Sequence, residues 1–250
     1  MTLLIWIFSL SVLFLGLNHL LRVLPAKIAA AFFIIVFILI NIYTHYYPTK
    51  EELTFFIILK LYSVCLGVVY IQWMRFTGEK WYPLGQKIGY FILFVNILEA
   101  TFFDFIDADY FNALLGVALL VSLKGPSAVS VNQNSRYRDV EYDLSMAWVF
   151  AYCLWNFVFN YNFRTGEGIP LAFFHLILPL ILSLANPKLF IQHRAYFLAF
   201  SVLWFVSLPH EPPFIFQTPG IFIPWLAHIL TAIGFGCVAI DVIARKNKNN

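Results

Sequence analysis

The sequence contains few charged residues. Asp, Glu, Lys and Arg make up only 12% of its 250 residues, whereas 61% are hydrophobic, and the mean hydropathy is +0.79. Soluble globular domains carry about 25% charged residues, so this composition excludes an ordinary soluble domain, a disordered chain and a coiled coil. Apolar runs occupy nearly the whole chain and leave no room for a separate soluble catalytic domain. We therefore expect residues 1–250 to form a single transmembrane helical domain.

Cysteine is also scarce, and motifs for metal or serine chemistry are missing. Cys65, Cys153 and Cys237 each lie alone within an apolar run. The sequence contains no C-x-x-C, H-E-x-x-H or G-x-S-x-G pattern, so we expect no disulfide framework, no metal and no cofactor. The first apolar run has no basic residues before it and no A-x-A-like site after it, which predicts a retained transmembrane helix and not a signal peptide.

Long apolar runs fill the rest of the sequence. A transmembrane helix needs about 20 predominantly apolar residues, and nine segments come close to this length or exceed it. The predicted fold class is therefore all-α, a polytopic α-helical membrane protein with nine transmembrane helices. The fifth segment is short and follows the acidic stretch 104–109, so eight spans is the alternative. The predicted spans cover residues 2–21, 28–44, 53–74, 88–106, 108–123, 144–163, 169–186, 193–208 and 221–243.

The positions of lysine and arginine predict the orientation. If the N-terminus is outside, all basic residues except Lys50, Lys60 and Arg164 fall on the cytoplasmic side, as the positive-inside rule requires. This predicts a multi-pass protein of the inner (plasma) membrane with a cytoplasmic C-terminus. Residues 124–143 are then a cytoplasmic loop, with Asp143 as the expected N-cap of the next helix. The net charge of +3 follows from this topology and does not indicate a nucleic-acid partner.

Polar residues recur at one depth of the predicted bundle. Five spans each place a polar side chain about 10 Å below the outer surface. Intramembrane ionisable groups are costly unless they are paired or hydrated, so this layer predicts a functional site. Lys60 and Glu99 are expected at a similar depth, with Asn96 on the same helix face as Glu99. The residues of the layer are Lys60, Glu99, Asn156, His175 and His228.

Each member of this layer also has a purely structural explanation. Lys60 could extend toward the outer interface, the ion pair could simply join two helices, and the histidines and asparagines could be interhelical hydrogen-bonding groups. An aromatic stripe at helical spacing, from Trp148 through Tyr152 and Trp155, could be a cavity wall or ordinary core. Pro179 lies four residues after His175 and cannot donate to its carbonyl, which needs another partner.

Four motifs follow one another along the sequence. They are Lys60-Leu-Tyr62-Ser63, Asn96-Ile-Leu-Glu99-Ala100 followed by Asp104-Phe105, Trp148-x3-Tyr152-x2-Trp155-Asn156-Phe157 leading to Tyr161-Asn162, and Gln192-His193-Arg194-Ala195. In this order they resemble a bacterial multi-pass membrane family catalogued only as a domain of unknown function. The resemblance is clearest over residues 60–200, and the chain departs from the family pattern at Phe103 and Cys153. It implies a shared polar set but no activity and no substrate. The shared set that the resemblance implies is Tyr62, Asn96, Glu99, Asp104, Tyr152, Trp155, Asn156, Asn162, His193 and Arg194.

The last motif and Asp104 with Asn162 form a possible second site or interface. Gln192, His193 and Arg194 begin a span on the cytoplasmic side, where basic residues are expected for orientation alone. Contact with a lipid headgroup or another anion at the inner interface is the alternative.

Two functions remain open at this stage. The first is small-solute binding or transport through a polar cavity in the outer half of the bilayer, by a permease or channel-like protein with the lipid bilayer and a small polar or lipidic molecule as partners. The second is a metal-independent intramembrane enzyme acting on a lipid or isoprenoid, with Glu99 or Asp104 as acid and His175 as base. Retinal-type sensing is disfavoured because the last span has no lysine. A purely structural subunit would leave the polar layer unexplained.

Overall fold

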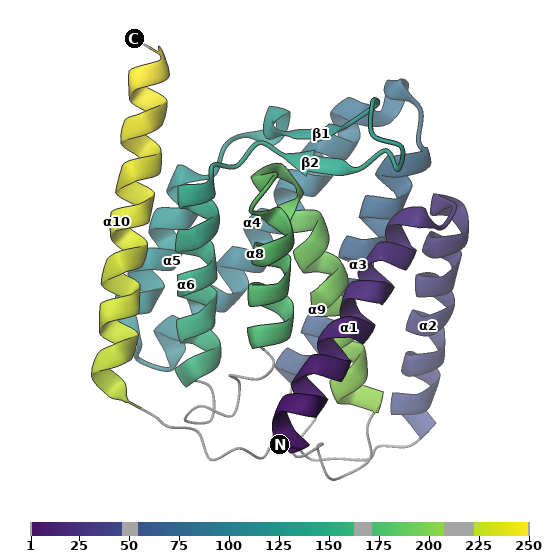
Figure 1. Ribbon diagram of the computed structural model, residues 1–250, viewed down its shortest axis with the longest axis horizontal. Coiled ribbons are helices and arrows are strands. Elements are labelled where there is room, and N and C mark those ends of the chain that lie inside the picture. Colours follow the sequence, from purple (N-terminus) through teal and green to yellow (C-terminus); the bar gives the residue numbers. More distant parts are fainter. Residues whose placement is uncertain (1, 47–54, 163–171, 208–222, 250) are drawn as a thin grey trace.

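The computed structural model describes residues 2–46, 55–162, 172–207 and 223–249. These residues form a bundle of helices that lie side by side, with the N-terminus and the C-terminus at opposite ends of the bundle (Figure 1). Each of the nine predicted segments contains helix, so the all-α prediction is confirmed. The main helices are α1 (Thr2–Val23), α2 (Ala26–Tyr46), α3 (Phe55–Phe76), α4 (Tyr82–Ile106), α5 (Tyr110–Ser122), α6 (Met146–Asn162), α8 (Leu178–Ser183), α9 (Phe190–Ser207) and α10 (Pro224–Asn249).

The seventh segment is irregular. A π-helical stretch, η4 (Phe173–Ile177), runs directly into α8. Pro179 lies in the first turn of α8, where its missing N–H would disrupt an α-helical ladder that reaches back to His175. The i→i+5 pattern of a π-helix occurs here, just before the proline.

Large apolar side chains cover the outside of the bundle. Phe8 on α1 is 70% exposed and Val121 on α5 is 83% exposed, and similar residues occur on α2, α4 and α10. By length and composition, two of the described helices could cross a membrane, Glu79–Ile106 and Trp225–Lys248. Four other apolar helices are shorter by this measure, namely Ile7–Val23, Ala26–Leu39, Tyr110–Ser122 and Phe173–Ser183. The prediction of nine spans stays a prediction.

The predicted loop 124–143 is folded. After a 3₁₀ turn, η2 (Pro126–Ala128), strands β1 (Val129–Val131) and β2 (Val140–Tyr142) pair antiparallel, with Val129 opposite Tyr142 and Val131 opposite Val140. The hairpin lies across the end of the bundle from which the C-terminal part of α10 extends (Figure 1). The segment that connects the two strands includes Arg138, whose φ is positive at 51°. Asn132 Oδ1 accepts hydrogen bonds from two backbone N–H groups in this turn.

The expected N-cap of α6 is wrong by two residues. Ser145 Oγ, and not the Asp143 carboxylate, accepts the hydrogen bond from Trp148 N at 3.1 Å. Asp143 instead pairs with Lys124 at the base of the hairpin. Both side chains are good cap acceptors, and the Lys124 ammonium draws Asp143 away from the helix start.

The core lies between the helices and beneath the hairpin. Trp148, Tyr152 and Trp155 on α6 are fully buried and pack ring to ring, with Trp148 and Tyr152 stacked at a centroid separation of 5.5 Å. Close packing of α3 on α4 depends on Gly89, where an added Cβ would collide with the Tyr70 hydroxyl. Two short 3₁₀ helices, η1 (Glu79–Trp81) and η5 (Pro187–Leu189), directly precede α4 and α9.

Candidate functional site

Lys60, Asn96 and Glu99 lie together between α3 and α4. Lys60 Nζ donates to Asn96 Oδ1 and to Glu99 Oε2, both at 3.3 Å. The side chains of Lys60 and Glu99 are only 14% and 10% exposed. The similar depths of these residues in the sequence thus correspond to a direct contact. Glu99 Oε1 is buried and accepts no hydrogen bond from any residue that the structure describes.

Arg194 approaches this group from α9. Its side chain is buried, with the residue 6% exposed, and its guanidinium lies over the Tyr152 ring at 4.8 Å from the centroid. Arg194 Nε has no hydrogen-bond acceptor, and within the described ranges we find no carboxylate paired with this guanidinium. Tyr152 also keeps its hydroxyl buried without a partner.

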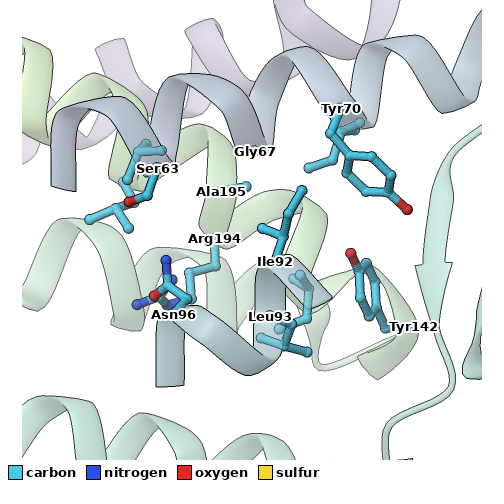
Figure 2. A pocket seen from close by; sticks show the side chains of 13 residues that line it. Ser63, Gly67, Tyr70, Ile92, Leu93, Asn96, Tyr142, Arg194 and Ala195 are labelled. Atoms are coloured by element: carbon cyan, nitrogen blue, oxygen red, sulfur yellow. The ribbon is translucent and has the colours of Figure 1, made fainter. Parts of the chain in front are cut away.

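A cavity of about 50 Å³ lies between α3, α4, α9 and β2. Figure 2 shows Arg194 and Asn96 at one end and the hydroxyls of Tyr70 and Tyr142 facing each other at the other. The remaining walls are mainly apolar. They are Ser63, Val64, Gly67, Ile71, Ile92, Leu93, Ile191, Ala195 and Leu198.

The cavity lies between the Lys60–Glu99 pair and the hairpin. Lys60 and Glu99 fill the end of this region away from the hairpin by binding each other. Toward the hairpin, Gly67 contributes no side chain, and a Cβ added there would have no neighbour within 4 Å. The open space therefore begins where α3 presents a glycine, and β2 closes its far end through Tyr142.

Asn156 and His175 form a separate polar cluster. His175 Nε2 lies 3.3 Å from Asn156 Oδ1, and Asn160 Nδ2 donates to the backbone and side-chain oxygens of Asn156. All three residues are buried. None of them lines the cavity, so the predicted layer divides into at least two groups of contacts.

Asp104 belongs to a third buried network that joins four helices. Asn112 on α5 donates to Asp104 Oδ2 at 2.9 Å and to the Trp155 carbonyl, and its own Oδ1 accepts from Thr231 on α10. Nearby, Asn162 donates to Asp109, which also caps α5. Asn112 was not among the predicted site residues, although it is an asparagine in an apolar run, the same signal that identified Asn156.

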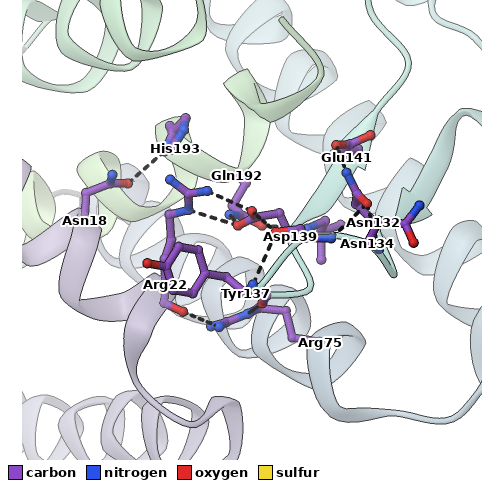
Figure 3. Close-up of polar contacts among 12 residues, drawn as sticks. Asn18, Arg22, Arg75, Asn132, Asn134, Tyr137, Asp139, Glu141, Gln192 and His193 are labelled. Atoms are coloured by element: carbon purple, nitrogen blue, oxygen red, sulfur yellow. Dashed lines mark hydrogen bonds and ion pairs between the residues drawn. The ribbon is translucent and has the colours of Figure 1, made fainter. Parts of the chain in front are cut away.

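Gln192 holds the hairpin against α9. Its Nε2 donates to Asp139 Oδ1, and its Oε1 accepts from Val140 N, both at 2.7 Å. Asp139 also receives two hydrogen bonds from Arg22 on α1, at 2.9 and 2.8 Å, and one from Ser135 (Figure 3). Burial raises the pKa of Asp139, but the hydrogen bonds from Arg22, Ser135 and Gln192 outweigh burial and bring it to about 2.

His193 and Arg75 make further contacts at the hairpin end of the bundle. His193 Nδ1 lies 3.0 Å from Asn18 Oδ1 on α1. Arg75 donates to the carbonyls of Leu21, Arg22 and Tyr137 and to Gln72 Oε1. Carbonyls at the C-terminus of α1 carry partial negative charge, which compensates the Arg75 cation. Sequence analysis counted Arg22 and Arg75 only as orientation signals and missed these contacts.

Tyr62 and His228 lie apart from the cavity. Tyr62 faces α2, where its hydroxyl donates to Asn41 Oδ1 and its ring meets Phe37. His228 is exposed on α10, with its ring 6.0 Å from that of Phe111. Equal depth in the bundle therefore did not place His228 beside Lys60 and Glu99, and Tyr62, which the resemblance implies, does not line the cavity.

Among the described residues, no group of three or more His, Cys, Asp or Glu side chains is placed to hold a metal ion. Residues 107–222 match a family of unknown function (DUF5692). The resemblance to an uncharacterised family is thereby confirmed for this segment, which includes the hairpin, α6 and α9. Comparison with curated proteins and with solved structures gives no match.

Proposed function

We propose that this chain is a nine-span membrane protein that binds, and in the simplest case transports, a small solute in the cavity beside Arg194. The observation that carries the proposal is the cavity itself, since it presents a buried cation among mainly apolar walls. Intramembrane cations in such positions mark substrate or ion pathways.

The distribution of side chains supports the membrane part of the proposal. Exposed Phe, Ile, Leu and Val residues surround the bundle on α1, α2, α4, α5 and α10, whereas asparagines and charged groups are buried within it. A soluble monomer rarely exposes contiguous apolar patches larger than a few hundred Å². The opposite ends of the chain lie at opposite ends of the bundle, as an odd number of crossings requires (Figure 1).

The proposed orientation places the N-terminus outside and the hairpin in the cytoplasm, in the inner (plasma) membrane. The hairpin end carries Arg22, Arg75 and Arg138, in agreement with the positive-inside rule. An impermeant thiol reagent should therefore label Ser130→Cys, which lies on the exposed face of β1, only after cells are opened. Lys50→Cys should be labelled in intact cells, and the reverse pattern would overturn the orientation.

The proposed solute binding can be tested by measuring whether a small reagent in the solvent reaches the cavity. In a background without Cys65, Cys153 and Cys237, we expect Ser63→Cys to react with the small reagent methyl methanethiosulfonate, because Ser63 lines the cavity. Asn156→Cys is buried outside it and should react much more slowly. Equal and slow reaction of both variants would contradict a cavity that solutes enter.

The enzyme alternative has less support. Glu99 and Asp104, the candidate acids, are each engaged by a neighbouring side chain, Lys60 and Asn112 respectively. The two carboxyls belong to different clusters. We therefore propose binding or transport over acid/base catalysis.

A further inference from the structure

Arg194 differs from the other arginines that are at least partly buried. In the described part of the chain, each of the others donates to at least one oxygen: Arg22 to Asp139, Arg75 to three carbonyls, Arg138 to Thr77 and Tyr82, and Arg245 to Ser122 and Asp241. Arg194 is as buried as Arg75, with 6% of each residue exposed, but among the described residues it donates to no oxygen and lies over the Tyr152 ring face. A buried guanidinium with unused N–H groups costs free energy that a bound acceptor would recover.

Two cations and one carboxylate of the described residues lie at one end of the cavity. Lys60 and Glu99 form a pair, and the Arg194 charge acts on Lys60 as a like-charged neighbour. This group of three described residues thus carries one positive charge in excess. Electrostatic interactions are strong where water is excluded, so the excess favours an anion in the adjacent space.

Resting on the proposed function, we propose that the cavity binds a small planar monovalent oxyanion, of the carboxylate, nitrate or bicarbonate class, against the Arg194 guanidinium. The guanidinium fork matches a planar oxyanion with two parallel hydrogen bonds. Asn96 accepts from Lys60 through Oδ1, so its amide NH₂ remains to donate at the same end of the cavity (Figure 2).

The size of the cavity limits the ligand. A cavity of about 150 Å³ admits benzene, and this one is about 50 Å³. Formate, acetate and nitrate are therefore expected to fit, whereas benzoate is not. Val64, Leu93 and Leu198 form apolar walls beside the body of the ligand, so an oxyanion whose remaining part is a hydrogen or a methyl group fits best.

The test is a titration of the purified full-length protein in detergent, with a bulky sulfonate as the only other anion. Thermal unfolding is followed as formate, acetate, nitrate or benzoate is added. We expect the first three to raise the melting temperature in a saturable way and benzoate to have no effect. Arg194→Gln should weaken binding by about 10- to 100-fold, the usual value of hydrogen bonds to a charged group. Arg194→Lys should weaken it about tenfold through loss of the fork.

A second variant keeps the test decisive if Arg194 is needed for folding. Gly67→Leu should fill the cavity with Arg194 intact, because an added Cβ meets open space there. Gly236→Leu, at an exposed glycine on α10 that also faces open space, is the matched control. We expect the rise in melting temperature with added anion to disappear in Gly67→Leu and to persist in Gly236→Leu.

The outcomes separate this inference from the proposed function. An identical anion effect in the wild type and in Gly67→Leu would overturn the inference, because binding would then lie elsewhere. No anion effect together with rapid labelling of Ser63→Cys would also overturn it, while the solute cavity would stand. No anion effect and no labelling would overturn both.

Discussion

The attachment of the hairpin through Asp139 gives a quantitative prediction. Asp139→Asn keeps the shape of the side chain but removes the charge that Arg22, Ser135 and Gln192 surround. Lowering the pKa from 3.8 to about 2 corresponds to about 2 kcal/mol of stabilisation. The new amide NH₂ also faces donors, and breaking buried pairs costs about 3–5 kcal/mol. We expect a loss of about 3 kcal/mol, or roughly 6–12 °C in melting temperature for a chain of this size.

Thermal unfolding in detergent at pH 7, followed by tryptophan fluorescence, measures this loss. Glu141→Gln is the matched control, since Glu141 lies on the same hairpin and accepts one hydrogen bond, from Asn132. It should lose less than about 1 kcal/mol. A loss for Asp139→Asn no larger than that of Glu141→Gln would refute the view that this carboxylate fastens the hairpin.

The same carboxylate predicts a pH dependence with a definite sign. The folded-state pKa lies below the ordinary value of 3.8, so the stabilisation is complete above about pH 4 and is lost as pH falls toward about 2. The difference in melting temperature between the wild type and Asp139→Asn should therefore shrink over this interval. A constant difference from pH 7 to pH 2.5 would contradict the ionised state assigned to Asp139.

Three further predictions concern the helices. Asn112→Leu leaves Asp104 and the Trp155 carbonyl without their donor and should cost about 2–3 kcal/mol in chemical unfolding, with a smaller loss refuting the network. Ser145→Ala removes the N-cap of α6 and should cost about 1 kcal/mol, whereas Asp143→Ala, which leaves that cap intact, should cost less in the same assay. Gly67→Ala should stabilise α3 by up to about 1 kcal/mol, since no atom lies within 4 Å of the added Cβ, and destabilisation would show that the space is already filled.

The sequence predicted the helices well because one strong physical signal defines them. Each apolar run is bounded by polar residues, and helices lie where the runs do. Depth along each run also predicted similar levels for Lys60 and Glu99, because each lies about seven residues from the end of its predicted span, and the structure brings the two side chains into contact. For this pair, depth along the helices was sufficient.

Depth alone could not identify the rest of the site. His228 has the expected depth but faces outward on α10, since depth does not specify the direction around a helix axis. Arg194 was interpreted as a residue of the inner interface, and only the packing of α9 on α3 directs it into the bundle. The sequence did not predict the hairpin, because strands of three residues are too short to show an alternation of apolar and polar residues.

The π-helical turn before α8 affects how the helix bundle tolerates the deletion of one residue. Consecutive residues of an α-helix are about 100° apart, so deleting one residue normally turns every later side chain onto another face. Within Phe173–Ile177, the i→i+5 turn already accommodates one residue more than an α-helical turn would. We expect a single deletion there to remove that extra residue and to leave Leu178–Ser183 facing α9. This short stretch is thus a place in the described bundle where we expect a residue to be lost with little effect on the packing that follows.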